Sequence, residues 1–491
     1  MPTITKPIIL DETGKSIQQT LEDKLDALIL AVSGNNSGGS PNFSSYAQLQ
    51  QLIRSGLGAK VLPVGTQLAT ERETSISIDK GDSTGITGAT IDEDTFLAQM
   101  GGAHEGIFEA TYDGAVWHKE NGETIILADY GIATTGTPVE GDHLIITESA
   151  ATLIWDVLDH DKHTFQNPAL TKGTVIGMAN CLQNFQFSAP QLLYYAPNGL
   201  AAGKYRITLY KGAYGGGTGQ DATYMFTLTQ AIPSGGGFRH STIGAYQSSY
   251  NKSQITGGTI TTYGALSNNA RATIESGIAV SIWDNSEATD LGTFSASIHA
   301  NLTATNNSTE RNAYGSNRWK TSALRQWLNS NVRAWKSGDT NNCLWWTAQT
   351  NFDMPPSDEG QRKQAGFLHG FGQDLLNLIQ PVAIVCSLTD VDKTTANEQE
   401  TTYDRVWLQS MTEMGWGNNN GAAEGSVFAY WYARNTNAQK IKYLNGSARY
   451  YWQRSAYPTV ASRVRYVITD GSLSDGNAVY SYAVVSACVL G

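Results

Sequence analysis

The chain has 491 residues, a length that predicts roughly two to four domains, because one ordinary hydrophobic core does not grow to this size. Its formal net charge is -11 and only 16% of its residues are charged, so it lacks the clustered lysines and arginines that binding to a polyanion requires. We therefore expect no nucleic-acid partner. Abundant glycine and short apolar runs between polar residues predict a mainly β, multidomain protein.

The N-terminal segment, residues 1–42, has neither a basic start followed by a long apolar core nor a stretch long enough to cross a bilayer. We therefore expect a soluble protein, without membrane insertion, that is not exported by the usual route. An amphipathic helix is predicted over 15–32, followed by a glycine- and serine-rich linker over 33–41.

The apolar stripe of this helix has no partner nearby in the sequence. A short parallel bundle of three copies would bury it, so we predict a homotrimer. The alternative is a helix that packs on the next domain of its own chain. The residues predicted to mediate oligomerisation are Ile17, Leu21, Leu25, Leu28 and Val32.

Two β domains are predicted in the middle of the chain, a small one over 43–163 and a sandwich-like one over 164–282. The first opens with a short helix over 46–55. Alternating apolar and polar residues predict strands over 73–78, 114–118, 143–146, 203–210 and 224–228, and a glycine turn is expected at 215–217. We interpret both domains as spacers or docking units.

Two sets of residues are candidate sites of chemistry. Residues 159–163, Asp-His-Asp-Lys-His, place two imidazoles and two carboxylates close together, but their position at a domain boundary favours solvated polar residues over a metal site. The four cysteines are scattered and are expected to be small buried apolar side chains. We predict no catalytic residue, no metal and no cofactor.

From about residue 283 the composition changes to dense tryptophan and asparagine with long connections. Residues 316–329, SNRWKTSALRQWLN, resemble the opening helix signature of a C-type-lectin-like domain found in phage and prophage tail proteins of gut bacteria. Further runs follow in the same family's order: GFLHGF at 366–371, LIQPV at 378–382, YDRVWLQS at 403–410, YWQRS at 451–455, VRYV at 464–467, DGSL at 470–473 and SACVL at 486–490. The stretches at 6–15 and 72–77 look like the attachment half of such proteins.

The resemblance implies a C-terminal α+β C-type-lectin-like domain over 283–491 that binds a bacterial cell-surface receptor, either a protein or a glycan. It implies an N-terminus that joins other phage tail or virion proteins, and a location in the virion after synthesis in the host bacterial cytoplasm. Members of this kind include variable proteins of diversity-generating retroelements, in which adenine mutation of AAC-type codons alters the contact residues. Between 456 and 483 the chain has no Lys, Glu, Gln, Met or Trp, the residues that such mutation cannot produce from AAC.

The positions that look like those varied in diversified members are the predicted receptor contacts. Their composition, rich in Tyr, Ser, Asn and Gly, is typical of adaptable binding loops. The alternative is that they are ordinary turn residues. The predicted contacts are Tyr457, Ala461, Ser462, Arg463, Tyr466, Ile468, Ser474, Asp475, Gly476, Asn477, Val479, Tyr480, Ser481 and Tyr482.

Other functions stay open at this point. A structural tail or capsid decoration protein would carry the same β spacers without a tyrosine-rich loop. A tailspike-like enzyme acting on surface glycan would need two carboxylates across a cleft, which sequence cannot place in space. Arg454 and Arg465 could hold an acidic ligand, but buried pairing is the expected role of framework arginines.

Overall fold

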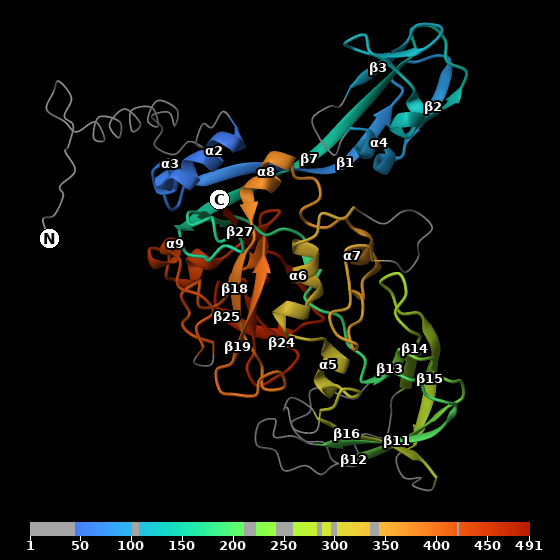
Figure 1. Ribbon diagram of the computed structural model, residues 1–491, viewed down its shortest axis with the longest axis vertical. Coiled ribbons are helices and arrows are strands. Elements are labelled where there is room, and N and C mark those ends of the chain that lie inside the picture. The colour runs from blue at the N-terminus through green and yellow to red at the C-terminus, as the bar shows by residue number, and fades with distance from the viewer. Residues whose placement is uncertain are drawn as a thin grey trace, which may run out of the picture.

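The computed structural model describes residues 45–100, 108–210, 222–241, 259–281, 287–295, 302–333, 343–419 and 422–491. The helix predicted over 15–32, with Ile17, Leu21, Leu25, Leu28 and Val32, and the turn predicted at 215–217 lie outside the described residues. The described protein is mainly β, as predicted, and its strands form several sheets (Figure 1).

Short helices and 3-10 turns connect the strands. The helix predicted over 46–55 is confirmed as α2, which continues through a π turn. The helical elements are α2 (Tyr46–Leu52), η1 (Ile53–Leu57), α3 (Gly58–Val61), α4 (Glu93–Gln99), η2 (Leu127–Tyr130), α5 (Thr309–Tyr314), η3 (Trp319–Thr321), α6 (Ala323–Leu328), α7 (Glu359–Lys363), α8 (Gln373–Leu378), α9 (Ala429–Tyr432) and η4 (Asn437–Lys440). Among the described residues, no helix is both long and apolar enough to cross a membrane.

A nine-stranded sheet runs through the main body, and strand β27, close to the C-terminal residue, is an inner strand of this sheet. Strand β27 pairs with β8 on one side and with β17 and β20 on the other. The sheet comprises β17 (Ile379–Gln380), β27 (Ser486–Leu490), β8 (Thr174–Met178), β7 (His143–His160), β3 (Glu109–Tyr112), β4 (Trp117–Lys119) and β5 (Thr124–Ile125), with β1 (Gln67–Asp79) beside β7 and β20 (Val406–Leu408) beside β27. Segments more than 300 residues apart in the sequence are thus hydrogen-bonded neighbours.

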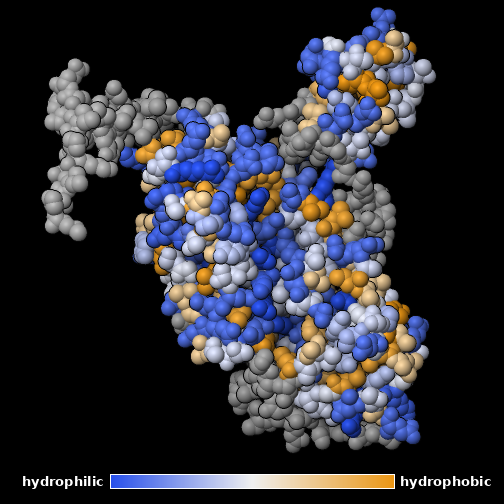
Figure 2. Space-filling view, in the orientation of Figure 1, coloured by the Kyte–Doolittle hydropathy of each residue, from blue (hydrophilic) through white to orange (hydrophobic). Residues whose placement is uncertain are grey.

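The long antiparallel ribbon of β1 and β7 carries a separate module at its far end. Near the body, Trp155 is buried in the main core and its Nε1 donates to Thr70 Oγ1 at 2.9 Å. Beyond a register shift between Glu73 and Ser75, the same two strands enter a second core that includes Ile76 and Ile146. Strands β2 (Ile86–Ile91) and β6 (Ile132–Gly136) complete this module, which stands apart from the body in Figures 1 and 2.

A third core lies in a seven-stranded sheet at the other end of the body (Figure 1). Alternation of apolar residues explains it, since Ile207, Phe226, Phe238 and Ile260 are buried together. The strand predicted over 203–210 is confirmed as β11. The sheet order is β10 (Tyr194–Ala196), β13 (Gly236–His240), β14 (Thr259–Tyr263), β15 (Thr273–Ser281), β12 (Ala222–Leu228), β11 (Gly203–Tyr210) and β16 (Thr289–Ser295).

The remaining strands belong to the main body, apart from β2 and β6 above. A five-stranded sheet has the order β25 (Leu473–Asn477), β24 (Arg463–Val467), β23 (Tyr451–Ala456), β26 (Ser481–Ala483) and β9 (Asn184–Gln186). Two-stranded pairs are β18 (Val382–Ser387) with β19 (Gln399–Asp404) and β21 (Tyr443–Leu444) with β22 (Ser447–Ala448).

The modules are nested in the sequence and do not follow one another as predicted. The boundary predicted at 163/164 falls between β7 and β8, which pair with each other. The boundary predicted at 282/283 separates β16 from the seven-stranded sheet to which it belongs. Residues 174–186 complete the C-terminal body, because β8 pairs with β27 and β9 pairs with β26. The far module and the seven-stranded sheet are therefore insertions in one discontinuous core.

The four cysteines have the predicted role. Cys181, Cys343, Cys386 and Cys488 are free and buried. Burial raises the pKa of the Cys181 thiol to about 12, and that of Cys343 to about 12. These thiols are consequently packing groups of low reactivity.

Nesting makes a direct prediction about the C-terminal segment. Residues 302–491 expressed alone should not form a cooperative fold, because β27 loses β8, β26 loses β9, and the buried rings of Phe185 and Phe187 leave the core. Each missing ring should cost about 3–5 kcal/mol. Near-ultraviolet circular dichroism and urea unfolding, compared with the full chain, measure this. A sharp transition at the full-chain midpoint would contradict the nested core.

Candidate functional site

Strands β24, β25 and β26 of the five-stranded sheet carry several of the predicted contact residues, and the others lie in the connections beside these strands. Trp452 lies opposite Tyr466, and Tyr466 lies opposite Ser474. Because directly opposite residues point to the same side of a sheet, these three side chains share one face. Arg463 and Arg465, which alternate with Tyr466 along β24, belong to the other face.

Four tyrosines gather on the first face, and we call Tyr450, Tyr466, Tyr480 and Tyr482 the tyrosine cluster. The ring centroids of Tyr466 and Tyr482 are 4.6 Å apart, those of Tyr450 and Tyr482 5.5 Å, and those of Tyr480 and Tyr482 5.8 Å. Tyr450 is 42% exposed and Tyr480 is 45% exposed, whereas Tyr466 and Tyr482 are half-buried. The cluster therefore presents aromatic surface to solvent.

The buried ring of Trp452 supports this cluster from beneath. Its centroid is 4.6 Å from that of Tyr482 and 6.0 Å from that of Tyr466. The indole Nε1 donates to the carbonyl oxygen of Phe185 at 2.9 Å, so the ring is fixed by a hydrogen bond as well as by packing. A rigid support of this kind lowers the entropy lost when the tyrosines bind a partner.

Gly476 makes room for the tyrosine rings. A Cβ atom at this position would lie 2.9 Å from Cε1 of Tyr466 and 3.5 Å from Cδ2 of Tyr480. Nearby, Asn477 Nδ2 donates to the hydroxyl of Tyr480 at 3.3 Å. Burial, reinforced by Tyr466, raises the pKa of Tyr482, so this phenol stays a neutral hydrogen-bonding group.

Charged residues on the opposite face pair with each other. Arg463 Nη1 lies 2.8 Å from Asp475 Oδ2, and Arg465 Nη1 lies 3.6 Å from Asp475 Oδ1. The guanidinium of Arg465 also lies 4.7 Å from the ring centroid of Tyr457. The two faces thus offer different chemistry, aromatic on one and paired charge on the other.

The predicted receptor contacts divide by burial. Ala461, Ser462 and Gly476 are buried, so they are not available for direct contact in this conformation. Both backbone polar groups of Ala461 are hydrogen-bonded: its N–H donates to Glu310 Oε2, and its carbonyl oxygen accepts from Arg311 Nε. The half-buried or exposed members are Tyr457, Arg463, Tyr466, Ile468, Ser474, Asp475, Asn477, Val479, Tyr480, Ser481 and Tyr482.

Tyr450 was missed by the sequence analysis. It directly precedes Tyr451 and Trp452, which are buried in β23. From residue type alone, Tyr450 therefore looks like one more core residue of the same apolar run. Its position two residues before Trp452 was the available signal, because period-two alternation puts both on one face.

A buried ionic network lies behind β23, in which all six residues are buried. Arg454 Nη2 lies 2.8 Å from Glu413 Oε1, Nη1 bonds the other carboxylate oxygen, and both side chains are 1% exposed. The guanidinium also donates to the carbonyl oxygens of Val385, Leu408 and Glu424. The expectation that Arg454 makes a buried structural pair is confirmed.

Opposing effects set the protonation of this network. Burial is the largest single effect and acts to lower the pKa of Arg454, but the charge and hydrogen bonds of Glu413, together with smaller effects of neighbouring groups, outweigh it, and the pKa is raised. Burial raises the pKa of Glu424, which accepts from the backbone N–H of Ser387 and from the hydroxyl of Ser455. Arg454 is therefore a permanent structural cation with its donors occupied.

Residues 159–163 do not converge on one point. Asp159 Oδ2 accepts from the N–H of Ala429, His160 Nδ1 contacts Thr174 Oγ1 at 3.1 Å, and Asp161 pairs with Lys172 at 2.9 Å. The ring of His163 packs edge-on against Trp407. In the parts of the chain that the structure describes, no group of three or more His, Cys, Asp or Glu is arranged to hold a metal ion.

Residues 81–85, Gly-Asp-Ser-Thr-Gly, fit the GxSxG pattern of hydrolase nucleophiles. That pattern requires an elbow between a strand and a helix, whereas Ser83 lies in the turn between strands β1 and β2. Its hydroxyl donates to the carbonyl of His143 at 2.8 Å and accepts from the N–H of His143 at 2.7 Å. The Ser83 hydroxyl is thus a buried structural bridge.

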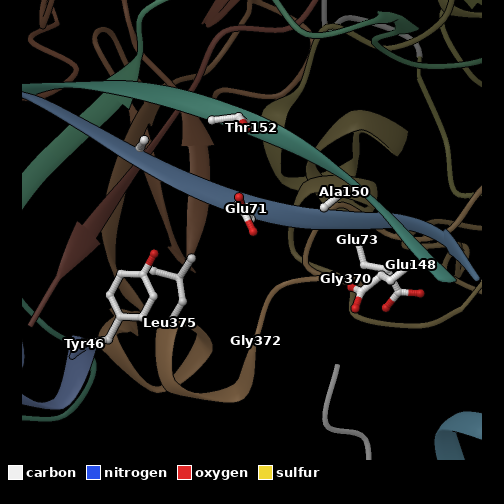
Figure 3. A pocket seen from close by; sticks show the side chains of 10 residues that line it. Tyr46, Glu71, Glu73, Glu148, Ala150, Thr152, Gly370, Gly372 and Leu375 are labelled. Atoms are coloured by element: carbon white, nitrogen blue, oxygen red, sulfur yellow. The ribbon is translucent and has the colours of Figure 1, made fainter. Parts of the chain in front are cut away.

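An acidic groove of about 640 Å³ follows the ribbon where it leaves the body (Figure 3). Glu71, Glu73 and Glu148 line it, with Tyr46 and Leu375 toward the other end. Burial, together with the charge of Glu71, raises the pKa of Glu148. Three carboxylates, whose relative positions could not be predicted from the sequence, thus line one groove. Among the described residues, the lining contains no His, Cys or Ser.

Comparison with known proteins concerns the C-terminal part. Residues 294–491 match a family model described as "Domain of unknown function (DUF6273)". This match covers less than half of the chain. It includes the tyrosine cluster and Arg454, but it omits β8 and β9, which complete the sheets of the same body. No curated protein and no solved structure matches the chain.

Removing one partner of the buried ion pair should be far more damaging than removing both. Arg454→Met leaves the Glu413 carboxylate buried without its cation, and we expect the free energy of unfolding to fall by about 3–5 kcal/mol. The double variant Arg454→Met/Glu413→Leu should recover a substantial part of that loss. Urea unfolding followed by tryptophan fluorescence measures both. A single variant as stable as the parent would show that the pair is not structural.

Proposed function

We propose that this protein is a phage or phage-tail-like receptor-binding protein whose C-terminal domain, C-type-lectin-like in fold, recognises a bacterial surface molecule through the tyrosine cluster. The observation that carries the proposal is the gathering of Tyr450, Tyr466, Tyr480 and Tyr482 on one sheet face, with two of the rings exposed. Three of the four lie within the segment whose composition is typical of variable contact residues.

The chemistry of the cluster suits recognition. A tyrosine gives a large amphipathic surface with few rotatable bonds, so it loses little conformational entropy on binding. Its ring stacks on sugar or apolar groups, and its hydroxyl forms hydrogen bonds. Ser474 lies opposite Tyr466 and Asn477 donates to the hydroxyl of Tyr480, so both add small polar groups that adapt to different ligands.

The N-terminal part fits an attachment and oligomerisation role in this proposal. Three copies joined through Ile17, Leu21, Leu25, Leu28 and Val32 would bring three tyrosine clusters to one host surface. Linked sites raise the effective concentration for each further contact, so weak individual sites suffice. Other tail or virion proteins would hold the N-terminus, and the mature protein would act in the virion after synthesis in the host cytoplasm.

Two alternatives remain and differ in what they require. A structural tail or capsid decoration protein needs neither the exposed tyrosines nor any ligand. A tailspike-like enzyme would have to use the acidic groove, where Glu71, Glu73 and Glu148 could exchange protons with a glycan. Release of reducing sugar from host glycan, abolished by Glu148→Gln, would favour the enzyme.

Cell binding tests the proposal. The double variant Tyr450→Ser/Tyr480→Ser should bind host bacteria at least about tenfold more weakly than the parent, because exposed central tyrosines commonly contribute most of an interface's affinity. Flow cytometry of the labelled full-length protein on a panel of gut bacteria measures this. Both rings are exposed, so the variant should keep the parent's melting temperature.

The chain supplies a matched control for that experiment. Tyr403 is 50% exposed and Tyr432 is 67% exposed, and both belong to the main body outside the cluster. Tyr403→Ser/Tyr432→Ser should bind like the parent. Equal losses in the two double variants would argue against recognition by the cluster, and a parent that binds no host would favour the decoration protein.

A further inference from the structure

A small pocket lies where the inserted seven-stranded sheet meets the main body. It has a volume of about 220 Å³ and is lined by Arg239 of β13, Tyr263 of β14, Arg271 and, from the body, Arg362 of α7. We propose that this pocket binds a compact anionic group, the carboxylate or phosphate of an acidic monosaccharide, at a site distinct from the tyrosine cluster. This proposal does not depend on the proposed function.

Two of the guanidinium groups are fixed by backbone carbonyls. Arg271 donates to the carbonyl oxygens of Gly235 at 2.8 Å and Asn351 at 2.9 Å, which belong to the inserted sheet and to the body respectively. Arg362 Nη1 donates to the carbonyl of Pro356 at 2.7 Å. The cations are therefore preorganised on both sides of the junction before any ligand arrives.

Arg239 retains unused hydrogen-bonding capacity. Its Nη2 donates to the carbonyl of Asn312 at 3.2 Å, while its Nε is buried and has no hydrogen-bond partner among the described residues. Burial lowers the pKa of Arg239, and Tyr263 is the neighbour that opposes this effect. A buried N–H of a cation that lacks an acceptor is costly, so an acceptor supplied by a ligand would be favourable.

The positive charge of the pocket is not balanced from within it. No acidic side chain is among its described lining residues. Asp353 lies next to this region and partly opposes the burial that lowers the pKa of Arg271, but all the hydrogen bonds described for its carboxylate come from Gln191 and from the N–H groups of Gln349 and Thr350. On α7, Asp358 accepts from the N–H of Gln361, and Glu359 pairs with Lys363. An anion from outside would supply the missing charge, in a chain whose net charge is -11.

The walls of the pocket define the class of ligand. Pro190, Met354, Pro355 and Pro356 are apolar, and Tyr263 adds a ring. The volume is below the range of about 300–1,000 Å³ found for drug-sized ligands, so it suits one sugar-sized unit. Apolar walls around three guanidinium groups fit a sugar ring with a single charged substituent, because planar guanidinium groups match carboxylate and phosphate oxygens.

Isothermal titration calorimetry of the full-length protein at low ionic strength tests the proposal. The probes are D-galacturonate, D-galactose 6-phosphate and neutral D-galactose, which differ in the substituent at one end of the same ring. We expect one or both anionic probes to bind and galactose to bind at least about tenfold more weakly, since charge-assisted hydrogen bonds dominate. The stronger of the two anions identifies the carboxylate or the phosphate as the source of the charge. Absence of binding by both anions would overturn the proposal.

Variants locate the site. Arg239→Gln should weaken the anionic probe at least about tenfold, whereas Arg206→Gln, which changes an arginine of the same sheet outside the pocket, should not. Equal affinities in both variants would overturn the assignment. If Arg239→Gln does not fold, the ¹⁵N–¹H signal of Arg239 Nε in the parent decides the question, because it should shift on titration with the anion and stay unchanged with galactose. The Tyr450→Ser/Tyr480→Ser variant should bind the probes like the parent, which separates this site from the tyrosine cluster.

Discussion

The buried ion pair between Arg454 and Glu413 fixes the strand on which the candidate recognition surface is built. The guanidinium group joins β23 to the carboxylate of Glu413 and to the carbonyl oxygens of Val385 in β18, Leu408 in β20 and Glu424 in a loop. Desolvation of two charges is offset only when their donors and acceptors are nearly all used, as they are here. Since β23 lies between β24 and β26, its position decides where the rings of Tyr466 and Tyr482 meet.

Nesting of the modules explains how one chain can offer several separate surfaces. The core is assembled from distant segments, and each insertion leaves it through paired or packed elements that restrict its direction, as the β1/β7 ribbon does in Figure 1. The acidic groove lies where that ribbon leaves the main body. The pocket lined by Arg239, Arg271 and Arg362 lies where the seven-stranded sheet meets the main body. Opposite charge at the two junctions means that they would not take the same ligand. The tyrosine cluster lies on the core itself, where the buried ring of Trp452 supports it.

Local pattern predicted much of the local structure in this chain, although the strand predicted over 114–118 begins only at Trp117. Alternation identified β11 at its correct bounds and placed 73–78 inside β1, while the role of Arg454 followed from the cost of burying an unpaired cation. Long-range pairing was not predictable, because alternation says which residues share a face but not which strand lies beside them. The pairing of β8 with β27 was therefore not predicted. The burial of Ala461 and Ser462 was not predicted either, because it accompanies hydrogen bonds with residues distant in the sequence: the N–H of Ala461 donates to Glu310, and its carbonyl accepts from Arg311.

Tyrosine footprinting on host cells tests the recognition surface most directly. The free and cell-bound proteins are nitrated with tetranitromethane, and each tyrosine is quantified by mass spectrometry. The account predicts that Tyr450 and Tyr480 are modified in the free protein and protected in the bound one, whereas Tyr403 and Tyr432, which are exposed elsewhere on the body, react equally in both. Unchanged modification of Tyr450 and Tyr480 on cells that bind the protein would contradict recognition by the tyrosine cluster.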